Sequence, residues 1–271
     1  MSDEVAIICS QADPASLNVA ERLLELEAWK DLEGYKSSGS RALVIHNERQ
    51  ISLRGLDARL KDLGLRPKVV VFASRHVSKA GLPWLGAHFT GVFENGQREL
   101  SAAAPSGLRS FLQNIGRLAP EGFRISAEAT HHGPTDMKTP SFFAEIGSSE
   151  PEWRDPRAGE AVARAILALE IKELPVALGF GGGHYVQRQT DLMLDAGIAF
   201  GHLFSSYQVG FLDAGLVDDA RRKSGASFAY LDRKSFRSED KKKVLRILEE
   251  VGLPVLQSKE IRAKFPALGD E

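Results

Sequence analysis

Two adjacent histidines follow a run of residues that is typical of a buried strand. His131 and His132 lie in the sequence Glu-Ala-Thr-His-His-Gly-Pro-Thr, and Glu128 begins this segment three residues upstream of His131. The Gly-Pro pair ends the strand, and two neighbouring imidazoles would be a poor choice for a core. At this place imidazole and carboxylate groups can bind a metal ion or transfer protons, because open α/β sheets form their active crevices at the carboxyl ends of strands.

Three further histidines lie close to the ends of apolar runs that are typical of strands. Because parallel strands end at a common edge of a sheet, we expect these side chains to converge there. The alternatives are an ordinary exposed turn for His76 and a hydrogen-bonded core histidine for His202. The three are His76, after 69–73; His184, after 176–180 and a glycine stretch; and His202, within 198–204.

Glu145 lies between apolar residues in a short strand-like run. If it is buried, its carboxylate must be paired, bound to a metal or raised in pKa; at a strand edge it would point to water. We interpret His46 and His88, which lie in less distinctive segments, as structural. The imidazole and carboxylate groups together suit Zn²⁺ with one position open for water, and their spacing contains no His-Glu-x-x-His motif.

A glycine stretch precedes His184 and Tyr185. It does not fit the dinucleotide-binding pattern, because His184 occupies the position of the third glycine, and it lacks the Gly-Lys-Ser/Thr of a P-loop. Glycine allows the backbone to bend sharply and to approach a ligand closely, which is the interpretation that we favour; the alternative is a flexible connection. The stretch comprises Gly181, Gly182 and Gly183.

Basic residues are concentrated in one segment of a chain whose formal net charge is only −1. Between residues 221 and 246 there are ten lysines and arginines and three acids, with Phe228, Tyr230 and Phe236 among them. Such a band can contact a phosphate backbone, although a solvated helix face has the same composition. The residues predicted to contact nucleic acid are Arg221, Arg222, Lys223, Arg233, Lys234, Lys241 and Lys242.

The bulk composition excludes several classes of protein. The 271 residues are 43% hydrophobic and 26% charged, which suits one large domain or two modest ones. The single cysteine, Cys9, excludes an intramolecular disulfide and a Cys-rich zinc module. The acidic start, Met1–Glu4, lacks the pattern of a secretion signal, and no apolar run approaches the ~20 residues needed to cross a bilayer. We expect a soluble, cytoplasmic protein without a membrane partner.

Apolar strand-like runs alternate with amphipathic helical stretches along the chain. This alternation predicts an α/β fold with a mixed, largely parallel sheet flanked by helices. We interpret residues 1–271 as one domain, and a shift in composition near 210–218 is the only sign of a smaller second subdomain. Strands are predicted at 5–9, 42–46, 69–73, 123–130, 176–180, 198–204 and 228–231, and helices at 14–29, 56–63, 106–118, 159–171 and 238–251.

Four segments together resemble the archaeal and plant type of D-aminoacyl-tRNA deacylase. The resemblance extends from Val5 to about Leu256, and it depends on the joint pattern rather than on any one motif. It implies a phosphorylase/hydrolase-like α/β fold, also seen in bacterial peptidyl-tRNA hydrolase, and dependence on zinc. The segments are Ser74–His76, Glu128–Thr135, Glu145–Ser148 with Trp153, and Gly181–Tyr185.

The resemblance implies hydrolysis of the ester bond between a D-amino acid and the 3′ adenosine of tRNA, which releases the free D-amino acid and tRNA. It also implies a Zn²⁺-activated water and binding of the tRNA by its acceptor end, and we expect a monomer. In this interpretation His76, Glu128, His132 and His184 bind the metal, His131 or Glu145 acts as general base or orients the ligands, and Gly181, Gly182, Gly183, Tyr185 and His202 contact the substrate.

Three other functions remain open from the sequence. A metal-independent esterase, similar to bacterial peptidyl-tRNA hydrolase, would use one histidine as a general base and bind no zinc. A nucleoside or nucleotide phosphorylase would share the fold type but would require phosphate. A non-catalytic RNA-binding module would keep its function when His132 is replaced.

Overall fold

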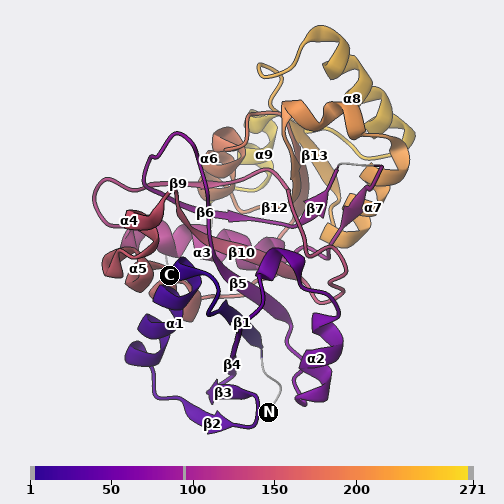
Figure 1. Cartoon of the computed structure of the whole chain (residues 1–271). Helices are drawn as coiled ribbons and strands as arrows, with labels where there is room; N and C mark the ends of the chain where they lie inside the picture. Colours follow the sequence, from indigo (N-terminus) through magenta and orange to yellow (C-terminus); the bar gives the residue numbers. More distant parts are fainter. Residues whose placement is uncertain (1–3, 94–95, 268–271) are drawn as a thin grey trace.

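An eight-stranded mixed sheet forms the centre of the molecule (Figure 1). The structure is a computed structural model that describes residues 4–93 and 96–267. In sheet order, the strands are β2 (Lys30–Leu32), β3 (Tyr35–Ser38), β4 (Arg41–His46), β1 (Val5–Ser10), β5 (Val69–Arg75), β10 (Ser141–Gly147), β6 (Trp84–His88) and β9 (Arg124–Ala127). β4, β1, β5 and β10 are parallel and β6 is antiparallel to β10, which confirms the predicted mixed, largely parallel sheet.

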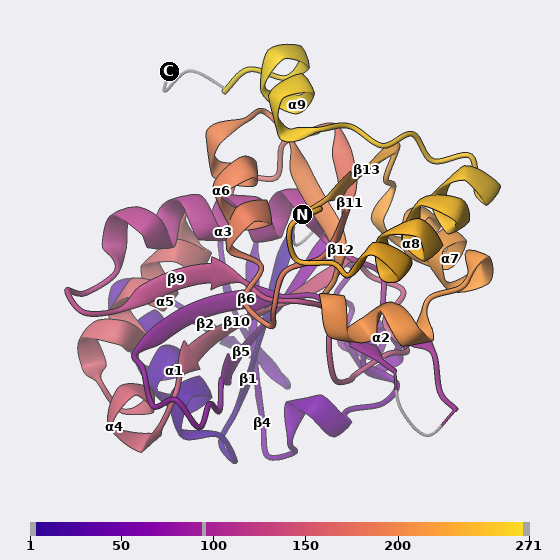
Figure 2. The ribbon, with the colours of Figure 1, turned by 90° about the horizontal axis from the view of Figure 1, so that it is seen from above.

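Helices cover both faces of this sheet (Figures 1 and 2). They are α1 (Pro14–Leu26), α2 (Leu56–Asp62), α3 (Pro105–Leu118), α4 (Glu150–Trp153) and α5 (Pro156–Leu167), with the 3₁₀ helix η1 (Gln50–Ser52). α1, α3 and α5 pack together on one face, and α2 lies on the other. Asp13 and Asp155 fix the starts of α1 and α5, because each side chain accepts hydrogen bonds from the first main-chain N–H groups.

Alternate side chains of the central strands face two different cores. In β10, Ala144 packs in the core beneath α1, α3 and α5, whereas Phe143 packs in the core on the side of α2. Because the side chains of a strand alternate between the two faces of a sheet, Glu145 lies on the same face as Phe143. We call this the second face; the polar cluster described below lies on it.

A second sheet of three parallel strands lies beside the large one (Figure 2). Its strands, in order, are β12 (Ala199–Phe204), β11 (Val176–Phe180) and β13 (Phe228–Leu231). Around it are α6 (Gln187–Asp195), η2 (Ser206–Phe211), α7 (Ala214–Ser224), α8 (Ser238–Glu250) and α9 (Ser258–Lys264). The segment 210–218 lies between two strands of this one sheet, so the change from one sheet to the other occurs earlier, before β11.

Residues 127–130 join the two sheets. Glu128 forms an isolated antiparallel bridge with Tyr185, and the main-chain N–H of Ala129 donates to the carbonyl of His184 at 2.8 Å. The N–H of Thr130 then donates to the carbonyl of Leu203, in β12, at 2.7 Å. The strand predicted at 123–130 therefore ends at Ala127 in the large sheet, because the residues that follow also pair with the small one.

Some elements differ from the sequence-based predictions. The helix predicted at 159–171 begins earlier, after the cap Asp155, and ends at Leu167. The predictions omit β6, α6, α7 and a two-stranded ribbon of β7 (Gly91–Val92) and β8 (Glu99–Leu100). None of the helices in residues 4–93 and 96–267 is long and apolar enough to span a bilayer, and Met1–Asp3 lie outside the described residues.

Two glycines within helices give a matched test of the packing between α1 and α5. A Cβ at Gly159 would lie 2.2 Å from Oδ1 of Asn18, whose amide donates to the carbonyls of Trp153 and Asp155. A Cβ at Gly116, on the exposed side of α3, would have no neighbour within 4 Å. We expect Gly159→Ala to lower the free energy of unfolding by about 1–3 kcal/mol.

We expect Gly116→Ala to raise the same free energy by about 0.5–1 kcal/mol, because alanine favours a helix and has room there. Urea denaturation of both variants checks the pair. Equal effects of the two substitutions would contradict the close contact between Asn18 and α5.

Candidate metal centre

A cavity of about 310 Å³ lies where the second face of the large sheet meets the carboxyl ends of β1, β4 and β5. β1 has β4 on one side and β5 on the other, so the chain order reverses at this point. Open α/β sheets bind ligands at such a switch point. The lining includes Ala12 and Asp13 after β1, Arg49 and Gln50 after β4, Arg75 and His76 at the end of β5, and His131, His132, Glu145 and His184.

Two carboxylates are buried beside this cavity. Glu145 belongs to β10 and Glu128 follows β9, and each residue is at most 1% exposed. Gly86 in β6 makes room for Glu128, because a Cβ at that position would lie 2.3 Å from Oε1 of the glutamate. A buried carboxylate costs several kcal/mol unless cations or hydrogen-bond donors offset its charge, so these two groups require partners.

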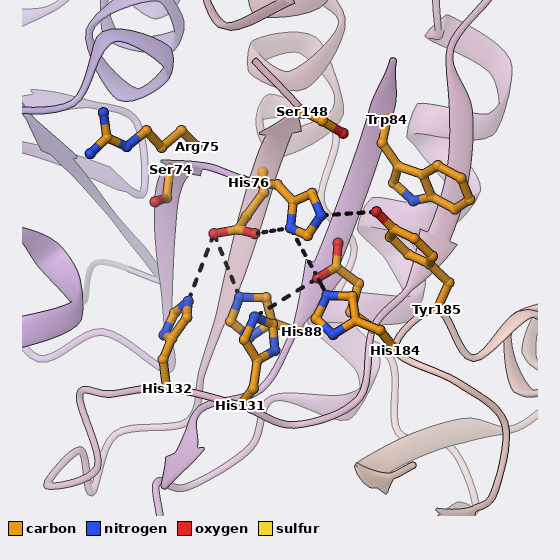
Figure 3. A network of polar contacts seen from close by, with 12 residues as sticks. Ser74, Arg75, His76, Trp84, His88, His131, His132, Ser148, His184 and Tyr185 are labelled. Atoms are coloured by element: carbon orange, nitrogen blue, oxygen red, sulfur yellow. Dashed lines mark hydrogen bonds and ion pairs between the residues drawn. The ribbon is translucent and has the colours of Figure 1, made fainter. Parts of the chain in front are cut away.

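Five histidines surround the two carboxylates (Figure 3). Nδ1 of His76 lies between them, 3.4 Å from Glu128 and 3.5 Å from Glu145. Each carboxylate then has two further imidazoles of its own. Around Glu145 are Nε2 of His88 at 3.6 Å and Nε2 of His132 at 4.0 Å; around Glu128 are Nε2 of His184 at 2.9 Å and Nε2 of His131 at 3.9 Å.

Main-chain carbonyls fix the tautomer of three of these histidines. A carbonyl can only accept a hydrogen bond, so the Nδ1 that faces it must carry the proton. When the ring is neutral, Nε2 is then left with a free lone pair, as a metal ligand requires. The three bonds run from His88 to the carbonyl of Phe89 at 3.0 Å, from His131 to that of Ala129 at 2.8 Å, and from His132 to that of Gly133 at 2.7 Å.

The two carboxylates and the imidazoles perturb one another. Burial raises the pKa of Glu145, but His88, His76 and His132 outweigh burial and hold that pKa well below its usual range. Burial lowers the pKa of His76 and of His88, but the neighbouring carboxylates outweigh it and raise the pKa of both imidazoles. Glu145 is therefore ionised at neutral pH.

His131 and His132 shift in the other direction. Burial, together with neighbouring imidazoles, holds the pKa of His131 well below its usual value and lowers the pKa of His132 to about 4. Both rings are therefore neutral at pH 7, which is the form that binds a metal ion. The backbone of His132 has a φ of 40°, in the left-handed region that residues other than glycine rarely adopt, and such strain is typical of functional sites.

Two groups of side chains offer donor atoms close enough together to hold metal ions. In each group, three donor atoms lie within 4.8 Å of one another. Both oxygens of Glu128 and Nε2 of His88 are buried and have no hydrogen-bond partner of good geometry among the described residues. A cation would satisfy these atoms, so the residues present fit a metal such as Zn²⁺. The groups are His88, His131 and His132, and His76, Glu128 and His184.

Tyr185 orients one of these imidazoles. Its hydroxyl lies 2.9 Å from Nε2 of His76, which leaves Nδ1 directed at the two carboxylates (Figure 3). The Tyr185 ring stacks on Trp84, with ring centroids 3.8 Å apart. Contact of Tyr185 with substrate stays a prediction, and Trp84 leaves only the other face of the Tyr185 ring open to a ligand. The hydrogen bond to His76 is of the kind that fixes a metal-binding imidazole in position.

The structure brings together six of the groups singled out in the sequence: His76, Glu128, His131, His132, Glu145 and His184. His88, which we interpreted as structural from the sequence, also lies in the cluster, with its Nε2 3.6 Å from Glu145. β6 is antiparallel to β10, so His88, the last residue of β6, lies opposite Phe143 near the amino end of β10. The glycine at position 86, two residues earlier on the same face, is the sequence signal that could have indicated a close approach there.

His202 does not reach the cavity. It is fully buried, its Nε2 donates to the carbonyl of Ser101 at 3.0 Å, and its Nδ1 accepts from the hydroxyl of Thr130 at 3.1 Å. Both ring nitrogens are thus bonded within the protein. The structure corrects the assignment of His202 to substrate binding: it is the hydrogen-bonded core histidine that the sequence offered as the alternative.

The glycine stretch has a conformational requirement of its own. Gly181 and Gly182 have φ angles of 98° and 87°, which favour glycine. A Cβ at Gly181 would lie 2.5 Å from Oγ of Ser235, so the close approach is to another part of the chain. The stretch carries His184 to the candidate metal centre, and contact of Gly181, Gly182 and Gly183 with substrate stays a prediction.

The basic residues lie on three parts of the fold: α7, the loop after β13, and α8. Arg221, Arg222 and Lys223, in α7, each pair with Asp218 or Asp219 about one turn earlier. These acids offset the local charge excess of α7. Arg233 and Lys234 follow β13, and Lys241 and Lys242 lie in the first half of α8. Contact of these residues with tRNA stays a prediction.

The burial of His202 predicts a pH dependence of stability. Burial lowers the pKa of His202 to about 4, whereas the unfolded chain titrates near 6.5. Between these values the unfolded state binds more protons than the folded state. The contribution of His202 to the free energy of unfolding is therefore fully present above pH 6.5 and is lost as the pH falls towards 4. We expect the loss from this group to reach about 3 kcal/mol, at about 1.4 kcal/mol for each pH unit.

Urea denaturation of the native protein and of His202→Gln from pH 7 to pH 4 isolates this contribution. The glutamine amide of the variant can still donate a hydrogen bond but does not titrate, so its curve should fall less steeply. Parallel curves would show that His202 does not bind a proton on unfolding.

Comparisons with known proteins agree with this geometry. Residues 63–256 match the family model described as D-aminoacyl-tRNA deacylase. A D-aminoacyl-tRNA deacylase of Methanothrix thermoacetophila is 50% identical, covering 96% of this chain and 99% of that protein; one of Methanosarcina mazei is 44% identical, covering 97% and 95%. A crystal structure of a conserved protein of unknown function, AF0625, has a TM-score of 0.88 at 33% identity, covering 98% and 99% of the two chains. The chain therefore belongs to the D-aminoacyl-tRNA deacylase family.

Proposed function

We propose that this protein hydrolyses the ester bond of D-aminoacyl-tRNA at the cavity beside Glu145, with the help of bound Zn²⁺. The observation that carries the proposal is the enclosure of two buried carboxylates by five imidazoles at the wall of a ligand-sized cavity. Membership of the D-aminoacyl-tRNA deacylase family supplies the substrate class.

The two donor groups would hold the metal. One comprises His88, His131 and His132, and the other His76, Glu128 and His184. When bound, Zn²⁺ lowers the pKa of a coordinated water towards ~7 and polarises a carbonyl oxygen. His131, which the sequence offered as a general base, belongs to a donor group in this arrangement.

Glu145 belongs to neither donor group. It lines the cavity and is ionised, and we assign to it the acceptance of the proton of the attacking water. In the reaction the water oxygen bonds to the ester carbonyl carbon, the bond from that carbon to the ribose oxygen breaks, and the proton passes to the ribose oxygen. The products are the free D-amino acid and a tRNA with its terminal hydroxyl restored.

Two arginines make the cavity suitable for the end of a tRNA. Arg49 and Arg75 both line it. The backbone of Arg75 is fixed by a hydrogen bond from its N–H to Oδ2 of Asp13 at 3.1 Å, and its guanidinium lies over the Trp153 ring at 5.1 Å. When the ester lies beside Glu145, arginines at the cavity wall can contact the phosphate that precedes the terminal adenosine.

The activity test uses matched D- and L-aminoacyl-tRNA and follows release of the amino acid. We expect selective release from the D-form and a loss of at least about 100-fold in rate for His88→Ala, because the substitution removes a donor atom. His46→Ala, which changes a histidine outside the cluster, is the control and should keep the native rate.

Equal release from both forms, or from neither, would overturn the proposal. Exhaustive chelation should abolish release and zinc should restore it. Full activity with metal below stoichiometric amounts would remove zinc from the proposal and would favour the metal-independent esterase.

The contact between Tyr185 and His76 predicts an effect on metal affinity. Tyr185→Phe keeps the ring on Trp84 but removes the hydroxyl that orients His76. We expect zinc affinity to fall by about 10-fold to 100-fold, measured by competition with a chromophoric chelator. Tyr230→Phe, which removes a hydroxyl in the small sheet, is the control. Equal zinc affinity of the two variants would contradict an orienting role for Tyr185.

A further inference from the structure

Three loops meet at the carboxyl edge of the small sheet. They follow β11, β12 and β13, whose last residues, Phe180, Phe204 and Leu231, lie side by side in register. The N–H of Ser206 donates to the carbonyl of Gly182 at 2.9 Å, and the N–H of Gly182 donates to Oγ of Ser235 at 2.8 Å. The loops therefore form one continuous surface, which we call the β11 edge: residues 181–184, 205–208 and 232–237.

This edge adjoins the metal centre. Gly182, which is bonded to Ser206, is two residues from His184, and two residues of chain span at most about 7 Å. His184 is the most exposed histidine of the cluster, with 42% of its side chain accessible, and it lines the cavity. A chain-like ligand whose end lies in the cavity can therefore continue directly across the β11 edge.

An aromatic ring stands free on this edge. Tyr207, in η2, is 81% exposed, and no other large apolar side chain of the described residues is as exposed. Its neighbours in sequence hold η2 in place, because Oγ of Ser206 donates to the carbonyl of Gly182 at 3.0 Å and Nε2 of Gln208 donates to the carbonyl of Thr130 at 2.7 Å. An exposed ring on a fixed backbone is a stacking platform.

Free positive charge lies on the same edge, in the loop that follows β13. Arg233, Lys234 and Arg237 are exposed and take part in none of the ion pairs found among the described residues. Asp232, the acid within the same turn, is paired with Arg188 at 2.7 Å. In contrast with Arg221 and its neighbours in α7, the basic residues of the β11 edge therefore present charge that no ion pair in the described part of the chain offsets.

We infer that the β11 edge binds the single-stranded 3′ end of tRNA, with Tyr207 stacked on a base and Arg233 and Lys234 on the adjoining phosphates. The inference rests on the proposed function and adds to it the path by which the RNA enters. A single strand of nucleic acid offers unpaired bases, which stack on an aromatic ring, and phosphates, which attract basic side chains. Sequence-independent stacking and charge also suit an enzyme that must accept many tRNAs.

The test measures binding of a stem-loop RNA that ends in an unpaired 3′ CCA, and of the same stem-loop without these three nucleotides, by fluorescence anisotropy. We expect Tyr207→Ala to weaken binding of the CCA-ended RNA by about tenfold and to leave binding of the shortened RNA unaltered. Tyr207→Phe, which keeps the ring, should bind like the native protein.

Salt dependence tests the charges. Replacing both Arg233 and Lys234 by Ala should reduce the slope of log affinity against log salt by about 1.4, as expected for two contacts with phosphates of a single strand. The control replaces Lys61 and Arg66, two basic residues near the amino end of β5, by Ala. It removes the same charge at the opposite edge of the fold and should keep the native slope.

Kinetics separate this inference from the proposed function. We compare kcat/KM on D-aminoacyl-tRNA with kcat/KM on the 3′ D-aminoacyl ester of adenosine, which lacks the preceding nucleotides. In Tyr207→Ala the ratio of the two should fall about tenfold, through KM. An unchanged ratio together with unchanged CCA binding would overturn the inference alone, whereas failure of the native protein to hydrolyse either ester would overturn the proposed function.

Discussion

The charge of two buried carboxylates is the constraint on which the rest of the site depends. Glu128 and Glu145 are removed from water, and the groups that face their oxygens are imidazoles. Imidazoles offset the negative charge of a carboxylate only if they are protonated or if they share a metal cation with it. His131 and His132 are neutral, and buried atoms of Glu128 and His88 lack hydrogen bonds. A bound cation would offset the carboxylate charge and would also satisfy these atoms, whereas protonated imidazoles alone would not do both.

The site also explains why two sheets are needed. The large sheet supplies Glu145, His76 and His88, but His184 comes from the loop after β11 in the small sheet. Residues 127–130 join the two sheets, and they carry Glu128 to the point where both contribute nitrogen atoms. Neither sheet alone would surround both carboxylates, so the smaller one is part of the candidate metal centre and not an appended module.

The sequence predicted what depends on local pattern. Alternation of apolar runs and helical stretches predicted the mixed α/β sheet, and polar residues after strands identified His76, His131, His132 and His184. His88 was missed because β6, the strand that it ends, was not predicted. His202 lies within β12 and faces Ser101 and Thr130, and only the packing of the small sheet determines that. The ion pairs of Arg221 and Arg222 with Asp218 or Asp219 could have been predicted from their separation of three or four residues in a helix. The charge count missed them because it covered residues 221–246 and so left out both acids.

The tautomers of His88, His131 and His132 are fixed by carbonyls of Phe89, Ala129 and Gly133, not by side chains. A metal site that relies on carboxylates of other residues to orient its imidazoles is lost when either partner mutates. Here the acceptors are backbone atoms, so no side chain has to be kept for the sake of these three hydrogen bonds. What must be inherited unchanged is the course of the backbone from 88 to 91 and from 128 to 133, which makes insertions and deletions there more damaging than most substitutions.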